Sequence, residues 1–166
     1  MHRGDREFLN NMRIAYLNHF DKAKVLELGS LDINGTARDG FTNCEFVGID
    51  KFPGKCVDIV VEAKNTVFTP GYFDTIVSMS MFEHDAEWKL SLSHNLQWLR
   101  SGGFLMLSWG AEGNRYHEPD PWALIPINDM LEFAKTLPLK DIDIFFEREK
   151  YYPDCDGCCN MTAFKL

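Results

Sequence analysis

The sequence has 166 residues, 45% of them hydrophobic and 25% charged, which is the composition of an ordinary globular domain. The formal net charge of −8 disfavours a nucleic-acid partner, because an acidic surface repels phosphate backbones. No apolar run approaches the roughly 20 residues that span a bilayer, and the first residues lack the apolar core of a signal peptide. We therefore expect a single domain over residues 1–166, without a membrane segment and located in the cytoplasm.

Hydrophobic periodicity divides the chain into alternating helices and strands. Helices are expected over residues 8–20 (within an N-terminal segment 1–22), 34–39 with Asn34 as candidate N-cap, 83–99 and 127–137. The expected strands are 24–28, 45–49, 57–61, 73–79, 104–109, 141–147 and 160–166. The Ser-Gly-Gly sequence at 101–103 is expected to end the long third helix, because glycine readily adopts the left-handed conformation. This alternation is typical of an α/β domain with a mostly parallel sheet.

The turn after the first expected strand has the features of a ligand site. Gly29 follows this strand directly, and without a Cβ its backbone can approach a ligand closely. Glu27, when ionised, only accepts hydrogen bonds and therefore suits an ammonium group. Asp50 ends the next strand about 20 residues later, the spacing at which a carboxylate binds ribose hydroxyls. Each feature alone is typical of an ordinary turn or a solvated strand end, whereas the pair within an α/β pattern favours a binding site.

Five sequence blocks in order extend this pattern over about half of the chain. They are VLELGS at 25–30, VGID at 47–50, VDIVVEA at 57–63, FDTIVSMSMFEH at 73–84 and LRSGGFLML at 99–107. On these blocks the chain resembles the class I S-adenosylmethionine-dependent methyltransferases. The resemblance implies a Rossmann-like three-layer sandwich with a mostly parallel seven-stranded sheet, in which the last strand is antiparallel and inserted beside the sixth.

The same resemblance implies S-adenosylmethionine as the cofactor and methyl transfer by direct displacement at its sulfonium. The acceptor is expected to be an O or N nucleophile, on a small molecule rather than on a nucleic acid. A different class stays open: the short chain, with almost no added substrate domain, also suits a non-catalytic S-adenosylmethionine-binding partner subunit. The sequence leaves the identity of the acceptor and the oligomeric state open.

By its position in the resemblance, the turn after the first strand would hold the methionine part of the cofactor. Glu27 would lie near the amino group, and Gly29 and Ser30 would line the cofactor. The turn departs from the usual glycine-rich pattern at Leu31 and Asp32, so Asp32 either contacts the cofactor or caps the following helix. The G-x-G-x-x-G pattern of a nicotinamide enzyme, which brings a pyrophosphate to a helix N-terminus, is missing from the sequence here.

The ends of the second and third strands would hold the nucleoside part. Asp50 would take the ribose hydroxyls, and Lys51 would lie along the adenine. Glu62 would accept a hydrogen bond from the adenine amino group, and the backbone N–H of Ala63 would donate to a ring nitrogen. These roles come from the resemblance alone.

The end of the fourth strand would border the reacting centre. Ser78 and Met79 would lie beside the methionine part and the sulfonium. His84 follows them, and an imidazole with an ordinary pKa near 6.5 suits a general base if the acceptor must lose a proton. The alternative is that His84 is a structural residue in the first turn of the long helix.

The segment at 109–126 is rich in glycine, proline, aromatic and polar residues and is expected to form a loop on the substrate side. Arg115, Tyr116 and His117 are its candidate acceptor contacts. The alternative is that Tyr116 and Trp122 only attach the loop to the body of the domain.

The sequence contains five cysteines, and three of them, Cys155, Cys158 and Cys159, lie close together. A structural zinc site needs four ligands, and no fourth ligand follows nearby. We therefore expect no metal site, and the sequence leaves any role of these three cysteines open.

Overall fold

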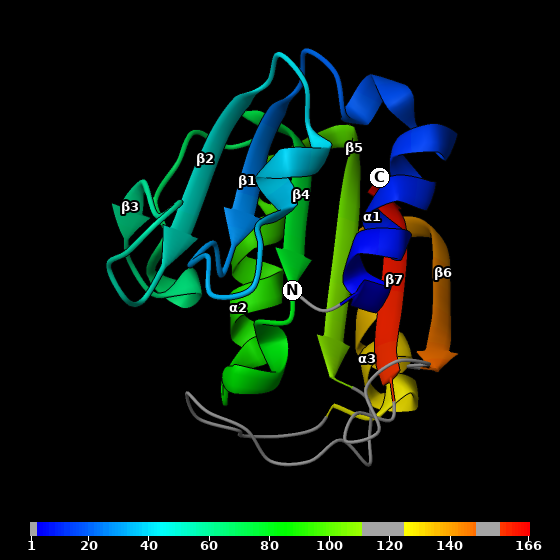
Figure 1. Ribbon diagram of the computed structural model, residues 1–166. Coiled ribbons are helices and arrows are strands. Elements are labelled where there is room, and N and C mark those ends of the chain that lie inside the picture. Colours follow the sequence, from blue (N-terminus) through cyan, green and yellow to red (C-terminus); the bar gives the residue numbers. More distant parts are fainter. Residues whose placement is uncertain (1–2, 111–124, 149–156) are drawn as a thin grey trace.

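A seven-stranded sheet with the order β3-β2-β1-β4-β5-β7-β6 forms the centre of the computed structural model, which describes residues 3–110, 125–148 and 157–166 (Figure 1). The strands are β1 (Lys24–Leu28), β2 (Glu45–Asp50), β3 (Ile59–Val60), β4 (Phe73–Met79), β5 (Leu99–Gly110), β6 (Leu139–Arg148) and β7 (Gly157–Lys165). All pairs from β3 to β5 are parallel, whereas β7 runs antiparallel to both β5 and β6. The predicted sheet, with its antiparallel last strand inserted beside the sixth, is confirmed.

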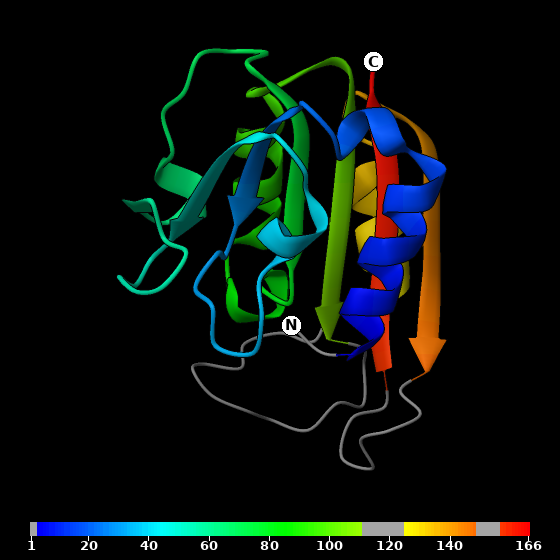
Figure 2. The same cartoon turned by 45° about the horizontal axis from the view of Figure 1, so that its top comes forward.

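Helices cover both faces of this sheet and complete the three layers. Helix α1 (Arg3–Ala15) lies on one face, and α2 (Trp88–Leu96) and α3 (Ile127–Ala134) lie on the other (Figures 1 and 2). Short 3₁₀-helices are formed by Leu17–His19, Ala37–Gly40, Ala63–Asn65 and Phe82–His84. Within the described ranges, no helix is both long enough and apolar enough to cross a membrane.

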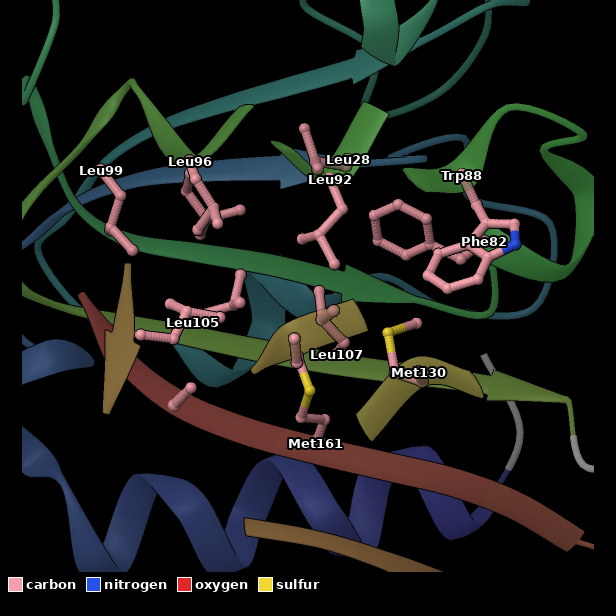
Figure 3. Packing of buried hydrophobic residues seen from close by; sticks show 14 of the residues in the cluster. Leu28, Phe82, Trp88, Leu92, Leu96, Leu99, Leu105, Leu107, Met130 and Met161 are labelled. Carbon is pink, nitrogen blue, oxygen red and sulfur yellow. The ribbon is translucent and has the colours of Figure 1, made fainter. Parts of the chain in front are cut away.

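Alternate side chains along the strands pack into two separate apolar cores. Leu26 and Leu28 of β1 point into the core beneath α2 and α3, where Leu92 of α2 and Met130 of α3 approach Leu107 of β5 (Figure 3). Val25, between them in sequence, belongs to the core beneath α1. A strand that is apolar on both faces is what a central parallel strand requires, because helices cover it from both sides.

The strand order places a crevice at the ends of β1 and β4. The chain leaves β1 toward β2 and β3 on one side and returns to β4 on the other, so the order of the strands reverses between β1 and β4. Loops that follow these two strands diverge there, and in open α/β sheets ligands bind at this switch point. The carbonyl oxygen of Ile49 accepts hydrogen bonds from the N–H groups of Gly29 and Ser30, each at 2.9 Å, which holds the loop after β1 against the end of β2.

The predicted long helix over 83–99 is wrong at both ends. Asp85 interrupts it, because its carboxylate accepts hydrogen bonds from the Glu87 N–H at 2.8 Å and the Ser91 hydroxyl at 2.5 Å, and α2 begins only at Trp88. At the other end, the Lys165 ammonium group donates to the carbonyl oxygens of Leu96 and Leu99, where the chain turns into β5. The helix therefore has nine residues.

The predicted helix over 34–39 and strand over 57–61 are also shorter than expected. Thr36, and not Asn34, is the N-cap of the 3₁₀-helix Ala37–Gly40, and its hydroxyl accepts a hydrogen bond from Arg38 N at 3.1 Å. Only Ile59–Val60 pair with β2. Before them, the Asp58 carboxylate accepts a hydrogen bond from the Gly48 N–H at 2.7 Å, which replaces regular backbone pairing between the strands.

Two further boundaries differ from the expectation. The Ser-Gly-Gly sequence at 101–103 lies inside β5 and not after a helix, and the pairing with β4 shifts register there, with Gly102 at φ +69°. The first helix spans 3–15 instead of 8–20, because Tyr16 leaves the helical conformation at φ −130° and ψ 47° and its ring packs 4.8 Å from the ring of Phe104. The last helix ends at Ala134, where its three closing N–H bonds form a turn that leads into β6.

Two leucines of α2 provide a test of the packing. Leu92 is 1% exposed within the core, whereas Leu90 is 51% exposed on the outer face. We expect Leu92→Ala to lower the free energy of unfolding by about 2–5 kcal/mol, because it leaves a cavity beside Leu28. Urea titration of both variants measures the difference, and Leu90→Ala, the matched control, is expected to change stability by less than about 0.5 kcal/mol. Equal losses would contradict the assignment of α2 to the core.

Candidate functional site

A cavity of about 430 Å³ lies at the carboxyl ends of β1, β2 and β4. The loops after these strands line it together with the segment 79–91, which follows β4. Of the residues predicted from the sequence, the cavity brings together Glu27, Gly29, Asp50, Lys51, Glu62, Ala63, Met79 and His84. These side chains come from segments up to 57 positions apart, so the topology of the sheet assembles the site.

Glu27 lies at the inner wall of the cavity and is only 2% exposed. Its carboxylate accepts hydrogen bonds from the Ala37 N–H at 3.1 Å and from the Thr36 hydroxyl at 3.3 Å. Burial raises the pKa of Glu27 to about 7, although these two hydrogen bonds act in the opposite direction. A cation that enters the cavity would stabilise the ionised form of this carboxyl group and so complete its ionisation.

Gly29 forms the turn immediately after β1, at φ +78°. A Cβ on this residue would lie 2.5 Å from both Cβ and Cγ of Met81, which lines the cavity from the other side. Glycine is thus required both by the left-handed backbone and by the close approach of the segment that follows β4. The close approach in the structure is that of Met81, and the predicted approach of a ligand to Gly29 stays a prediction.

Asp50 ends β2 and fixes two neighbouring loops. One carboxylate oxygen accepts from Leu31 N at 3.2 Å, and the other accepts from Phe52 N at 2.9 Å. Each carboxylate oxygen has two acceptor sites, so a second hydrogen bond to each remains available to a ligand. Lys51 is exposed at the rim, with its ammonium group 5.1 Å from the centre of the Phe52 ring.

Glu62 and Ala63 border the cavity beyond β3. Glu62 is exposed and accepts a hydrogen bond from the Asn65 side chain at 3.0 Å. Ala63 begins a 3₁₀-helix, so its backbone N–H belongs to the first turn, where N–H groups have no partner within the helix. Lys64 pairs with Glu87, which joins this side of the cavity to the start of α2.

Three predicted cofactor contacts are absent from the cavity lining. Ser30 is buried against β2, where a Cβ on Gly48 would lie 2.7 Å from its hydroxyl oxygen. Ser78 is buried and donates to the Leu28 carbonyl at 2.9 Å, which ties β4 to β1. Asp32 accepts from Gly35 N at 2.7 Å and pairs with the Lys55 ammonium at 2.5 Å, so it closes the turn before Thr36 and is not the cap of the following helix, which is Thr36. In the structure all three support the loops of the site.

The segment after β4 contributes lining residues that the sequence did not single out: Ser80, Met81, Asp85, Ala86, Glu87 and Ser91. Asp85, Ala86, Glu87 and Ser91 were missed because the sequence pattern assigned residues from 83 onward to one continuous helix. The only local signal was Asp85, a residue type that favours helix starts over helix interiors. His84 also lies in this segment and lines the same cavity as Met79.

The remaining sequence-based candidates have no described position at the cavity. Arg115, Tyr116 and His117 lie outside the residues that the structure describes, as do Trp122 and Cys155. Cys158 and Cys159 are buried in β7. Among the residues that are described, no three His, Cys, Asp or Glu side chains are arranged to hold a metal ion.

Solved structures provide the comparison, since no protein-family model and no curated protein matches the sequence. The 1,6-didemethyltoxoflavin-N1-methyltransferase of Burkholderia thailandensis has a TM-score of 0.74 at 14% identity, over 95% of this chain and 76% of that one. A phosphoethanolamine N-methyltransferase of Haemonchus contortus has a TM-score of 0.69 at 16% identity, over 93% of this chain and 52% of that one. This chain therefore spans about half the length of the Haemonchus enzyme.

A third solved structure with the same architecture is the [4+2]-cyclase SpnF, with a TM-score of 0.72 at 14% identity, over 96% of this chain and 80% of that one. The three likenesses establish that the chain has the Rossmann-like fold of class I S-adenosylmethionine-dependent methyltransferases. Because a cyclase shares this fold, the fold by itself does not specify methyl transfer.

Proposed function

We propose that the chain is an S-adenosylmethionine-dependent methyltransferase that acts on an O or N nucleophile of a small molecule. The observation that carries the proposal is that three acids, Glu27, Asp50 and Glu62, reach one cavity from the ends of successive segments of the sheet. This acceptor set matches a cofactor with an ammonium group, two ribose hydroxyls and an adenine amino group, all of which donate hydrogen bonds. A volume of about 430 Å³ lies within the range of small-molecule sites.

The connection between β1 and β2 also favours this cofactor over a dinucleotide. Between these strands, where every residue is described, the chain forms only the 3₁₀-helix Ala37–Gly40 and no α-helix. A pyrophosphate is normally bound by the N–H groups and the dipole of an α-helix in this position. A sulfonium nucleoside has no phosphate and does not need one.

In this proposal the protein contributes position more than chemical activation. When bound, S-adenosylmethionine supplies a methyl group that its positively charged sulfur has already activated. The carboxylates of Glu27 and Asp50 hold the two ends of the binding site, and Met79 borders the place of transfer. His84 lies at the same border and is the candidate base for an acceptor that must lose a proton.

The acceptor class is proposed from the ligands of two similar enzymes. The Burkholderia enzyme was crystallised with 1,6-didemethyltoxoflavin and the Haemonchus enzyme with phosphomonomethylethanolamine, both small molecules. By analogy with them, we propose a small-molecule acceptor for this chain. Arg115, Tyr116 and His117 stay predicted contacts to it.

A non-catalytic role is the second candidate. A Haloferax volcanii methyltransferase with this fold forms a complex with the Trm112 methyltransferase activator, so the fold can be part of an assembly. A chain that binds the cofactor as a partner subunit would keep Glu27 and Asp50 and would need no base at His84.

Calorimetric titration with S-adenosylmethionine and S-adenosylhomocysteine tests the proposal. We expect both to bind, and we expect labelled methyl transfer to at least one member of a panel of amines, phenols and nitrogen heterocycles. Failure of both cofactor forms to bind would refute the proposed function. Binding without any transfer would favour the partner-subunit alternative.

The ribose contact gives the first quantitative prediction. Asp50→Ala should weaken binding of S-adenosylhomocysteine at least about tenfold, because the variant loses an acceptor pair and releases the N–H groups of Leu31 and Phe52. Asp39→Ala is the matched control, since Asp39 is exposed and lies outside the cavity lining. Calorimetry measures both affinities, and equal values for the two variants would exclude Asp50 as the ribose contact.

The burial of Glu27 predicts that cofactor binding depends on pH. A cation binds the ionised carboxylate, and the pKa of Glu27 is about 7 in the free protein. The affinity for S-adenosylhomocysteine should therefore rise with pH, by about ten- to thirtyfold between pH 5.5 and pH 8. Glu27→Gln should bind weakly and without this slope, and His84→Gln should keep the slope. If the slope persists in Glu27→Gln and disappears in His84→Gln, the titrating group is His84 and not Glu27.

A further inference from the structure

A row of three charged side chains crosses one wall of the cavity. Glu62 follows β3, Lys64 lies in the 3₁₀-helix Ala63–Asn65, Glu87 directly precedes α2, and all three line the cavity. The Lys64 ammonium group pairs with the Glu87 carboxylate and lies 3.6 Å from Oε2 of Glu62. Within the described ranges, these two carboxylates are the ion-pair partners of Lys64. We name the three side chains Glu62, Lys64 and Glu87 the Lys64 bridge.

Glu62 uses only one of its two carboxylate oxygens. The side-chain amide of Asn65 donates to Oε2 at 3.0 Å, and Lys64 approaches the same oxygen. Oε1 forms no hydrogen bond with the residues that the structure describes. Glu62 can therefore accept a hydrogen bond from a ligand, while Lys64 is close enough to compete with that ligand.

A buried network fixes the backbone next to Glu62. Asn95 of α2 is 1% exposed, and its amide nitrogen donates to the Ala63 carbonyl oxygen at 2.7 Å. The amide oxygen of Asn95 accepts from the Thr66 hydroxyl at 2.9 Å, and Thr66 is also 1% exposed. Because these groups are buried, the position of Ala63 against α2 does not depend on the exposed charges of the Lys64 bridge.

Glu87 does not stabilise the helix that it precedes through its side chain. It is the N-cap residue of α2, but its carboxylate accepts no capping hydrogen bond, and the Asp85 carboxylate accepts from the Glu87 N–H at 2.8 Å. The side chain of Glu87 is 52% exposed and that of Lys64 is 28% exposed. Exposed ion pairs contribute little to the stability of a fold. The effect of the Glu87 carboxylate is thus on the position of Lys64.

Glu87 and Glu62 compete for one ammonium group. The hydrogen bond to Glu87 raises the pKa of Lys64 above its ordinary value, and the charge of Glu62 adds to the rise, so Lys64 stays charged. If Glu87 were neutral, Lys64 would keep only Glu62 as a charged partner and would move toward it, because opposite charges attract more strongly at a shorter distance. An ammonium group in that position occupies the oxygens of Glu62 and cancels its charge.

The state of Glu62 determines which nucleobase edge fits this wall. Adenine presents an amino donor beside an unprotonated ring nitrogen, which matches a carboxylate beside the free backbone N–H of Ala63. Hypoxanthine has a carbonyl oxygen in place of the amino group. A free carboxylate repels that oxygen, whereas a carboxylate covered by the Lys64 ammonium group presents a donor to it.

We infer that Glu87 is a positioning residue for the nucleobase: it holds the Lys64 ammonium group away from Glu62 and so keeps Glu62 free to accept from the amino group of adenine. Glu87 acts through Lys64 and needs no contact with the base. The inference rests on the proposed function, because it assigns the adenine of S-adenosylmethionine to this wall. It explains how a cavity with an ammonium group in its wall selects a base that carries an amino group.

The test is a double-mutant cycle on Glu87 and Lys64. Calorimetry measures the binding of S-adenosylhomocysteine and of its hypoxanthine analogue, S-inosylhomocysteine, to wild-type protein, Glu87→Gln, Lys64→Met and the double variant. Glu132→Gln is the matched control, because Glu132 is an exposed acid of α3 outside the cavity lining. The control is expected to leave both affinities unchanged.

Wild-type protein should bind S-adenosylhomocysteine at least about tenfold more tightly than S-inosylhomocysteine. In Glu87→Gln the affinity for S-adenosylhomocysteine should fall about three- to fivefold, the scale of an exposed ion pair, while the affinity for S-inosylhomocysteine does not fall. The double variant should bind S-adenosylhomocysteine within about twofold of Lys64→Met alone, a rescue that a structural role of Glu87 would not give. Sodium chloride at about 0.5 M, which shortens the screening length to roughly 4 Å, should reduce the loss in Glu87→Gln.

Three results would overturn the inference: a loss in Glu87→Gln that persists when Lys64 is also replaced, an equal loss for both ligands, or no preference of the wild-type protein for S-adenosylhomocysteine. A change of less than about twofold in Glu87→Gln would overturn it as well.

Failure of the proposed function looks different, and adenosine and inosine reveal it when their binding to the same variants is measured by saturation-transfer NMR. If S-adenosylhomocysteine does not bind but adenosine binds with the same dependence on Glu87 and Lys64, the methyltransferase proposal fails and the nucleobase inference stands. If neither adenosine nor S-adenosylhomocysteine binds, both are wrong.

Discussion

The buried carboxyl group of Glu27 determines the shape of the cavity edge. A carboxyl group removed from water must be paired, and the Thr36 hydroxyl and the Ala37 N–H provide the pairing. These hydrogen bonds draw the loop after Gly29 across the end of β1 and set the point where the 3₁₀-helix Ala37–Gly40 begins. Because the same carboxyl group faces the cavity, the shape of the loop and the charge of the cavity depend on one residue.

The acids of the cavity combine a structural role with spare capacity for a ligand. Glu27 and Asp50 already have protein partners and keep spare acceptor capacity, which is suited to a cofactor that only donates.

Much of the fold was predictable because periodicity and turn residues report on local structure. The strand at 24–28 and the positions of Glu27 and Asp50 at neighbouring strand ends followed from the sequence, and the antiparallel last strand followed from the family resemblance. The failures arose where a side chain replaced a backbone hydrogen bond, as Asp85 does before α2 and Asp58 does beside β2. Such bonds link residues through the folded chain, and no periodic pattern records them.

The candidate site was predictable to a lesser degree for the same reason. A motif position indicates which strand end a residue occupies, but it does not indicate the direction of its side chain. Ser30 and Ser78 occupy the expected strand ends and yet face Gly48 and the Leu28 carbonyl instead of the cavity. The hydrogen bonds that Asp5 of α1 accepts from the Ser80 and Ser108 hydroxyls had no signal in the sequence, because they depend on the docking of α1 on the sheet.

The two ends of the described chain also differ in how they can be attached to other molecules. Arg3 begins α1 at the edge of the sheet that carries the cavity, whereas Leu166 lies at the opposite edge, where its carbonyl accepts from the Ser101 hydroxyl at 2.8 Å (Figure 1). A polypeptide or a solid support joined through residue 166 would leave the cavity facing the solution. The same attachment through the other end would crowd the entrance and pull on Asp5, so the choice of tether decides whether a surface-based binding measurement reports on the free site.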